Sequence, residues 1–253
     1  MKYLKIKKLK KFCMSMFIFL SILFLGISKE IRADSIRNYD VTVQMNKNGT
    51  LTVNEIIEYE FDEPRHGIYR DIPLRSKKSG VDIYKSHIKM NSVKRNGENE
   101  KYTTKYFSEG VRYVVGSRDR YIDTNINKYE FNYIIYNAVF EKNGIHQIYF
   151  NPIGQFWGVP IEKANVEIKF SNNNFIEKNE IQKIEVYSGS YGEKGENYKI
   201  TESNKSIKIQ SNETLEPYKG LSFMLNLKTN KINMTLMDKL KTLYYAEPVI
   251  IIG

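Results

Sequence analysis

The residues best suited to chemistry gather in the stretch FDEPRHGIYRDIPLR, residues 61–75. It holds a histidine, three arginines and three acids around Ile68, Tyr69 and Ile72. An arginine here could bind an anion, and His66 could transfer protons. The alternative is that these charges hold a fold together.

Two charged residues of this region occupy an otherwise apolar side of their strands. In the predicted strand 51–61, every second residue from Leu51 is apolar except Glu55. In the following segment, Arg70 is the lone charge between two isoleucines. Because a buried unpaired charge is strongly disfavoured, we predict a buried Glu55–Arg70 salt bridge with nitrogen and oxygen within about 4 Å.

The same alternation places Asp71 on the opposite side of the segment with Tyr69, so Asp71 cannot easily pair with Arg70. A functional alternative stays open, in which Arg70 or His66 binds an anion or transfers a proton. We favour the structural interpretation. The residues of this structural motif are Glu55, Gly67, Tyr69, Arg70, Asp71, Pro73, Trp157 and Pro160.

No other constellation in the sequence points to a reaction. The three histidines, at positions 66, 87 and 146, lie in separate segments without a spaced metal motif. Cys13 is the only cysteine. A chain from which residues 1–33 have been cleaved therefore contains no thiol and no disulfide. Carboxylate pairs for sugar hydrolysis must face each other across a cleft, which sequence does not reveal. We therefore expect no enzyme, no cofactor and no metal, and a thermal transition unaffected by chelator or reductant.

The elements that must position these residues are strands. Apolar residues recur at every second position from Ile36 onward, as in YDVTVQM, and again in 164–170, 207–209 and 221–227. Three Asn-Gly pairs, at 48–49, 96–97 and 143–144, supply the positive backbone angles of tight hairpins and predict antiparallel pairing. About ten strands with frequent turns predict an all-β fold, an antiparallel β-sandwich.

The sandwich is expected to occupy residues 34–230 as one extracytoplasmic domain, because no Pro- or Gly-rich linker divides them. The segment YEFNYIIYNAVF, 129–140, is apolar on both faces, which predicts a central strand covered on both sides. Residues 188–199 are polar and predict an exposed hairpin or loop. Trp157 is expected to fill a corner of the core before Pro160 starts the next strand.

The amino-terminal residues 1–33 have the pattern of an export signal. Six lysines in the first eleven residues precede an uncharged apolar run from Phe12 to Ile27. Cleavage between Ala33 and Asp34 is expected, although an uncut segment could serve as an anchor. The signal predicts a cell-membrane protein whose β domain lies on the extracytoplasmic side.

The segment 231–253 is predicted to be a short juxtamembrane amphipathic helix followed by the start of a truncated membrane segment. Leu236, Met237, Leu240, Leu243 and Tyr244 have the spacing of one helical face. This face either caps the domain core or rests on the membrane surface. The apolar run 249–252 begins a membrane helix or is a hydrophobic tail.

The net charge of +10 does not indicate a nucleic-acid partner. Residues 1–33 carry eight basic residues and one acid, a net of +7, which leaves +3 for the other 220 residues. Nineteen tyrosines and thirteen phenylalanines could form a sugar-stacking platform, but aromatic residues are also ordinary in strands. We expect them to serve mainly the core and the sheet faces.

Three motifs in order resemble a known family. The stretches are VNE at 53–55, GIYRDIP at 67–73 and FNPIGQFWGVPI at 150–161. They resemble the amino-terminal ectodomain of the YciQ-like bacterial predicted membrane proteins, classed as domain of unknown function 2207. The resemblance implies an exported β domain followed by membrane helices and a cytoplasmic tail, and it implies no reaction.

The leading functional hypothesis is a non-enzymatic interaction or sensing module at the cytoplasmic membrane, with an unknown extracytoplasmic protein as partner. The alternative is a carbohydrate-binding or carbohydrate-active module that acts on cell-wall glycan. A strip of exposed tyrosines or two facing carboxylates would favour the alternative.

Overall fold

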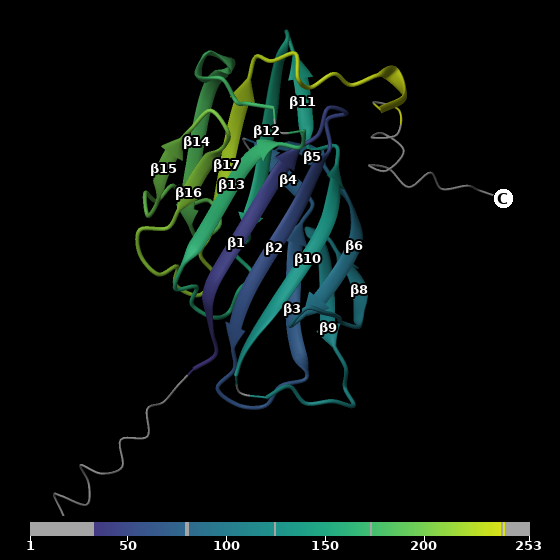
Figure 1. Cartoon of the computed structure of the whole chain (residues 1–253), viewed down its shortest axis with the longest axis vertical. Coiled ribbons are helices and arrows are strands. Elements are labelled where there is room, and N and C mark those ends of the chain that lie inside the picture. Colours follow the sequence, from purple (N-terminus) through teal and green to yellow (C-terminus); the bar gives the residue numbers. More distant parts are fainter. Residues whose placement is uncertain (1–32, 79–80, 124, 173, 239, 241–253) are drawn as a thin grey trace, which may run out of the picture. The chain divides into compact units, whose positions relative to one another are not determined.

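A computed structural model of the chain describes residues 33–78, 81–123, 125–172, 174–238 and 240. The predicted signal segment, apart from Ala33, and the apolar run 249–252 lie outside the described residues. Strands dominate the described part, which confirms the all-β class (Figure 1). The strands are β1 Ser35–Met45, β2 Leu51–Glu60, β3 Gly67–Pro73, β4 Arg75–Lys78, β5 Val81–Lys85, β6 His87–Arg95, β7 Glu98–Asn99, β8 Tyr102–Phe107, β9 Gly110–Gly116, β10 Ile126–Tyr136, β11 Val139–Lys142, β12 Ile145–Ile153, β13 Ala164–Phe170, β14 Ile181–Gly189, β15 Lys199–Glu202, β16 Ile207–Gln210 and β17 Gly220–Leu227, with a 3-10 turn η1 at Lys178–Glu180.

The described strands form an eight-stranded sheet, β15-β16-β13-β1-β2-β10-β6-β7, and three smaller ones, β11-β12-β17-β14, β3-β9-β8 and β4-β5. Pairing within them is antiparallel with one exception, because β1 and β13 run parallel. The prediction of purely antiparallel pairing is therefore wrong at this pair. No hairpin joins β13 to β1, so no tight turn dictates its direction.

Two of the three Asn-Gly pairs form the predicted tight turns. Asn96 and Gly97 join β6 to β7 with φ of 53° and 86°, and Asn143 and Gly144 join β11 to β12 with φ of 53° and 74°. Positive φ at both positions is the signature of a type I′ hairpin turn. The third pair lies in the longer connection 46–50, where Gly49 has a φ of 77°.

The segment 129–140 is not one strand covered on both sides. Strand β10 ends at Tyr136, the backbone turns at Asn137 with a φ of 56°, and β11 then enters a different sheet. On β10, Phe131 is buried on the inner face, whereas the amide of Asn132 on the outer face donates to the side-chain oxygen of Asn54. The segment thus contributes to two different sheets in turn, and its apolar residues do not belong to the two faces of one strand.

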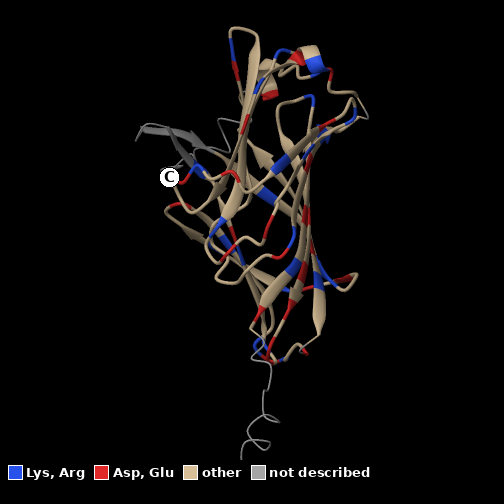
Figure 2. Ribbon diagram, turned by 90° about the vertical axis from the view of Figure 1, so that its left-hand side faces the viewer, with Lys and Arg blue, Asp and Glu red and all other residues tan. Residues whose placement is uncertain are grey.

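Buried side chains of the large sheet and of the sheets that contain β3 and β12 belong to one hydrophobic core. Figure 1 shows β1, β2 and β10 in front of β3 and β9. The inward side chains of these strands are buried, and acidic and basic positions are interspersed along the strands (Figure 2). Strand β13 begins at Ala164 as its alternation predicts, so Pro160 does not start it; Pro160 instead accepts a hydrogen bond from the Ile36 N–H through its carbonyl oxygen.

The carboxyl-terminal helix is present in its described part, residues 236–238 and 240. Thr235 and Asp238 cap its start reciprocally, since each main-chain N–H donates to the other's side-chain oxygen. Leu236, Met237 and Leu240 are 73%, 63% and 49% exposed. For these three residues, the exposures do not fit the alternative in which the apolar face caps the core. Within the described part of the chain, no helix has the length and apolarity needed to cross a membrane.

The entry into β3 depends on two opposed glycines. Gly67 pairs with Gly116 of β9, and their φ angles are 146° and 120°. A Cβ atom at Gly67 would lie 1.8 Å from the main-chain oxygen of Val115. Glycine at position 67 therefore allows β3 and β9 to approach closely, where the motif begins.

We predict that Gly67→Ala destabilises the domain by about 3 kcal/mol or more, because backbone must move to admit the methyl group. The matched control is Gly97→Ala, whose φ is 86° and whose Cβ would meet no atom within 4 Å. That control isolates the cost of the left-handed backbone, about 1–2 kcal/mol. Urea unfolding measures both, and equal losses would contradict the close-approach argument.

Candidate functional site

The predicted salt bridge between Glu55 of β2 and Arg70 of β3 is present. Arg70 Nη2 lies 2.6 Å from Glu55 Oε1, and Arg70 Nε donates to Glu55 Oε2 at 2.7 Å. The two side chains are 0% and 1% exposed. This bidentate geometry is the strong form of an arginine–carboxylate pair.

Two tyrosines complete the surroundings of the Glu55 carboxylate. Tyr39 of β1 donates its hydroxyl to Oε2 at 2.9 Å, and Tyr133 of β10 donates to Oε1. Burial raises the pKa of both tyrosines, which keeps the hydroxyls protonated as donors. The carboxylate thus accepts four hydrogen bonds, two from tyrosines on β1 and β10 of the large sheet and two from Arg70 on β3.

The guanidinium of Arg70 likewise finds its hydrogen-bond acceptors within the protein. Besides the carboxylate, it donates to the main-chain oxygens of Asp71 and Pro152, and its Cζ lies 5.9 Å from the Trp157 ring centroid. Burial alone would lower the pKa of Arg70, but the charge of Glu55 raises it above its usual value. Arg70 therefore stays charged, and its bonds within the protein argue against the anion-binding alternative.

Asp71 points away from this pair, as the alternation predicted. Its buried carboxylate accepts from Nε and Nη2 of Arg112 on β9, each at 2.7 Å. Arg112 is 45% exposed and its Cζ lies 5.1 Å from the centroid of the Tyr69 ring. Asp71 thus fixes an arginine over a tyrosine that is itself 62% exposed.

The other motif residues lie in different places around β3 and β1. Pro73 closes the strand opposite Gly110, and Trp157 packs edge-on against Tyr39 at 5.9 Å between ring centroids. Trp157 is 6% exposed, which agrees with its predicted place in the core. Pro160 lies apart, where its carbonyl bonds the start of β1.

Exposed aromatic side chains gather on the sheet that carries the motif, and the sequence did not single out this surface. We define the β3–β9–β8 outer face by Tyr69, Thr103, Lys105, Phe107 and Arg112, which the strand registers place on one side. Phe107 is 38% exposed and its ring centroid lies 5.9 Å from that of Phe156, which is 44% exposed. The alternation of YTTKYF in β8 already places Thr103, Lys105 and Phe107 on one side of that strand. That Arg112 lies beside Asp71 and Tyr69 follows only from the register of β3 against β9.

The histidines do not converge. His66 lies before β3, where its Nδ1 is 3.1 Å from the main-chain oxygen of Arg120 and its ring centroid is 4.1 Å from that of Tyr121. His87 begins β6, and burial lowers its pKa, whereas His146 is buried in β12. Across the described residues, no three His, Cys, Asp or Glu side chains are grouped to hold a metal ion.

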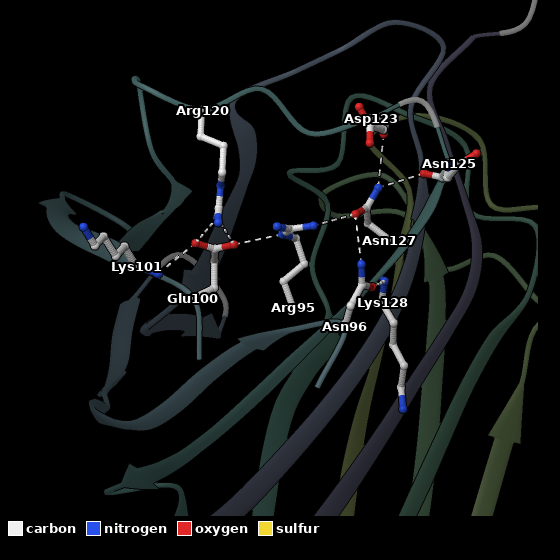
Figure 3. Close-up of polar contacts among 9 residues, drawn as sticks. All are labelled: Arg95, Asn96, Glu100, Lys101, Arg120, Asp123, Asn125, Asn127 and Lys128. Carbon is white, nitrogen blue, oxygen red and sulfur yellow. Dashed lines mark hydrogen bonds and ion pairs between the residues drawn. The ribbon is translucent and has the colours of Figure 1, made fainter. Parts of the chain in front are cut away.

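A second ionic cluster fixes the segment that His66 contacts (Figure 3). Glu100, which is 5% exposed, accepts from Arg95 Nε at 2.8 Å and from Arg120 Nη2 at 2.7 and 2.6 Å. Arg95 Nη1 also donates to the side-chain oxygen of Asn127, whose amide donates to the main-chain oxygen of Asn125. The cluster ties the connection between β9 and β10 to the β6–β7 hairpin.

We predict first that Arg70→Met costs about 3–5 kcal/mol of unfolding free energy, because it leaves a buried carboxylate unpaired. Glu55→Gln/Arg70→Met should cost much less, since glutamine keeps an acceptor for the tyrosine hydroxyls without a charge. The control is Arg37→Met, which removes ion pairs of a 41% exposed guanidinium and should cost about 1 kcal/mol or less. A double variant as unstable as Arg70→Met would overturn the pairing argument.

The Glu100 cluster predicts a pH dependence. Burial alone would raise the pKa of Glu100, but hydrogen bonds from Arg95 and the Lys101 N–H, with the charge of Arg120, lower it below the usual 4.5. A depressed folded-state pKa stabilises the domain above the unfolded-state value, and this stability is lost as pH falls through the folded value. Unfolding free energy between pH 7 and pH 3 should therefore fall less for Glu100→Gln than for the wild type. Glu98→Gln, in the same hairpin, is the control, and parallel curves for all three would refute the prediction.

Comparisons with known proteins bear on the family. The model of the "Predicted membrane protein (DUF2207) N-terminal domain" matches residues 35–226. Uncharacterized protein YciQ of Escherichia coli (strain K12) is 24% identical over 174 residues, which are 68% of this chain and 27% of that protein's length.

Among solved structures, yeast LTA4 hydrolase in complex with bestatin covers 81% of this chain and 32% of its own, with 7% identity and a TM-score of 0.46. The M1 zinc metallopeptidase from Deinococcus radiodurans covers 76% of this chain and 42% of its own, with 12% identity and a TM-score of 0.41. Likenesses at these scores establish neither a fold nor an activity. The match over residues 35–226, which includes β3 and its buried pair, shows that the chain belongs to the DUF2207 family of predicted membrane proteins.

Proposed function

We propose that the domain is a non-catalytic extracytoplasmic β-sandwich. It is part of a membrane protein, and it binds the partner of that protein. The observation that carries this proposal is the β3–β9–β8 outer face, where Tyr69 and Phe107 are exposed beside Arg112 and Lys105. Exposed aromatic and arginine side chains held in fixed positions are the usual anchors of protein interfaces.

The rigidity of this face supports a binding role. Tyr69 directly precedes Arg70, which is bonded inside the core, and shares its side of β3 with Asp71, which is bonded to Arg112. Because Arg70 and Asp71 are both held in place, Tyr69 loses little freedom when a partner binds, and a preorganised contact costs less to form.

The charged side chains of the motif already bond to groups within the protein, which supports a non-catalytic role. Glu55, Arg70 and Asp71 each direct their charged atoms at protein partners at 2.5–3.3 Å. A general acid, base or nucleophile needs reach to a substrate proton or bond. The buried pair is 0% and 1% exposed, which gives it no such reach.

Cell-wall glycan is the second candidate partner. Its support is also the outer face, because the rings of Tyr69 and Phe107 offer apolar surface and Thr103, Lys105 and Arg112 offer hydrogen-bond donors on the same side. A protein partner is the first candidate, because Arg112 stacked on Tyr69 is a compact anchor of the kind that interface cores use.

We predict that a photo-crosslinking aromatic amino acid in place of Tyr69, in the full chain expressed in cells, forms a covalent adduct with its partner. The same amino acid at Tyr191 is the control, because Tyr191 is 83% exposed and lies outside the outer face. An adduct with a discrete protein supports the first candidate. An adduct that wall-degrading enzymes release supports the glycan.

Tyr69→Ala gives the matching loss-of-function test. Truncation of an exposed ring should leave thermal stability nearly unchanged, while co-purification of the partner found by crosslinking is lost. Tyr191→Ala should retain the partner. If neither position forms an adduct, or if both do equally, the outer face is not the binding surface.

A further inference from the structure

Hydrogen bonds and one buried side chain hold the segment that follows β17 against one end of the domain. Lys231 Nζ donates to Glu180 Oε2 at 2.6 Å and to the main-chain oxygen of Phe175 at 2.7 Å. Ile232 is buried, and the Asn233 N–H donates to the main-chain oxygen of Lys47 in the β1–β2 connection. The helical residues 236–238 and 240 therefore follow a segment that is fixed beside residues 46–50.

The helix presents apolar side chains to the outside from this place. Leu236, Met237 and Leu240 are each at least 49% exposed, although their spacing puts them on one helical face. Three exposed neighbours of this size are unusual on a soluble surface unless something covers them. Among the described residues, the segment just before them packs on this end of the domain and does not cover them.

The same end supplies the side chains that suit a lipid headgroup layer. Phe175, whose carbonyl Lys231 bonds, is 52% exposed. Lys47 in the β1–β2 connection, Lys178 in η1 and Lys228 after β17 are exposed in segments that main-chain hydrogen bonds join at this end. Aliphatic and aromatic residues rimmed by lysines match the boundary between acyl chains and anionic headgroups.

The first described residues lie at the opposite end of the domain. Asp34 precedes β1 and accepts from the Asp62 N–H, next to the turn that leads to the motif. The eleven residues of β1 separate Asp34 from the β1–β2 connection. At about 3.3 Å per residue, this strand sets the two ends about 35 Å apart.

We propose that the end formed by the 46–50 connection, Phe175 and the helical residues 236–238 and 240 rests on an anionic lipid bilayer. Leu236, Met237 and Leu240 enter the headgroup boundary, and the lysines contact lipid phosphates. The long strands then stand away from the membrane, with Asp34 and the turn 62–66 at the distal end. This orientation is independent of what binds the β3–β9–β8 outer face.

Paired fluorescent labels test the orientation in the full chain. In a Cys13→Ser background, Lys47→Cys and Glu63→Cys each place a thiol on an exposed charged residue in a turn, one at each end. The bimane-labelled proteins are mixed with phosphatidylglycerol–phosphatidylcholine vesicles that carry a nitroxide quencher on the headgroup. We expect quenching of the label at position 47 and little quenching at position 63.

Substitution of the helix provides the second arm. Leu236→Ser/Met237→Ser/Leu240→Ser should abolish the quenching at position 47 without a change in melting temperature, because these side chains are outside the core. Tyr191→Ser, which removes an equally exposed ring elsewhere, should leave the quenching intact. Equal quenching at both positions, stronger quenching at position 63, no quenching at either, or quenching that survives the triple substitution would overturn the proposal.

Discussion

The fold around the motif depends on one buried ion pair. Removing Glu55 and Arg70 from water is costly, and the cost is offset only when each charge meets several partners at good geometry. Four donors reach the carboxylate, and two carbonyl oxygens complete the guanidinium. A slip of β3 by one residue would turn Arg70 outward and Tyr69 into the core. The pair therefore fixes the register of β3 against the large sheet.

The register of β3 also determines which of its side chains reach the surface of the domain. Once Arg70 points inward, the alternation of the strand sends Tyr69 and Asp71 to the other side, where the opposite residue of β9 is Arg112. The outward ion pair then holds Arg112 over the exposed ring. A motif of seven residues thus encodes an internal anchor and an external platform by the same two-residue period.

Sequence reasoning found the buried pair because each charge stood alone on an apolar face, a signal that needs no tertiary knowledge. It missed Tyr39 and Tyr133, since nothing in a chain of nineteen tyrosines marks which hydroxyls reach Glu55. It missed Arg112 and Glu100 because their contacts depend on the pairing of distant strands. The parallel β1–β13 pair and the break at Asn137 were missed for a related reason: periodicity reports which face is apolar, but it does not report which sheet the strand joins.

The same strands separate the two surfaces that the domain offers. Strand β2 runs from the 46–50 connection to the turn before the motif, so its ten residues set the spacing between the helix end and the start of β3. The strand is bonded on both sides, by β1 and β10, which makes that spacing rigid. If lipid holds the helix end, the rigid strand holds the 62–66 turn about 30 Å from the bilayer, by the rise of a strand. Tyr69, two residues into β3, is then held outside the headgroup layer, where a protein or glycan can reach it.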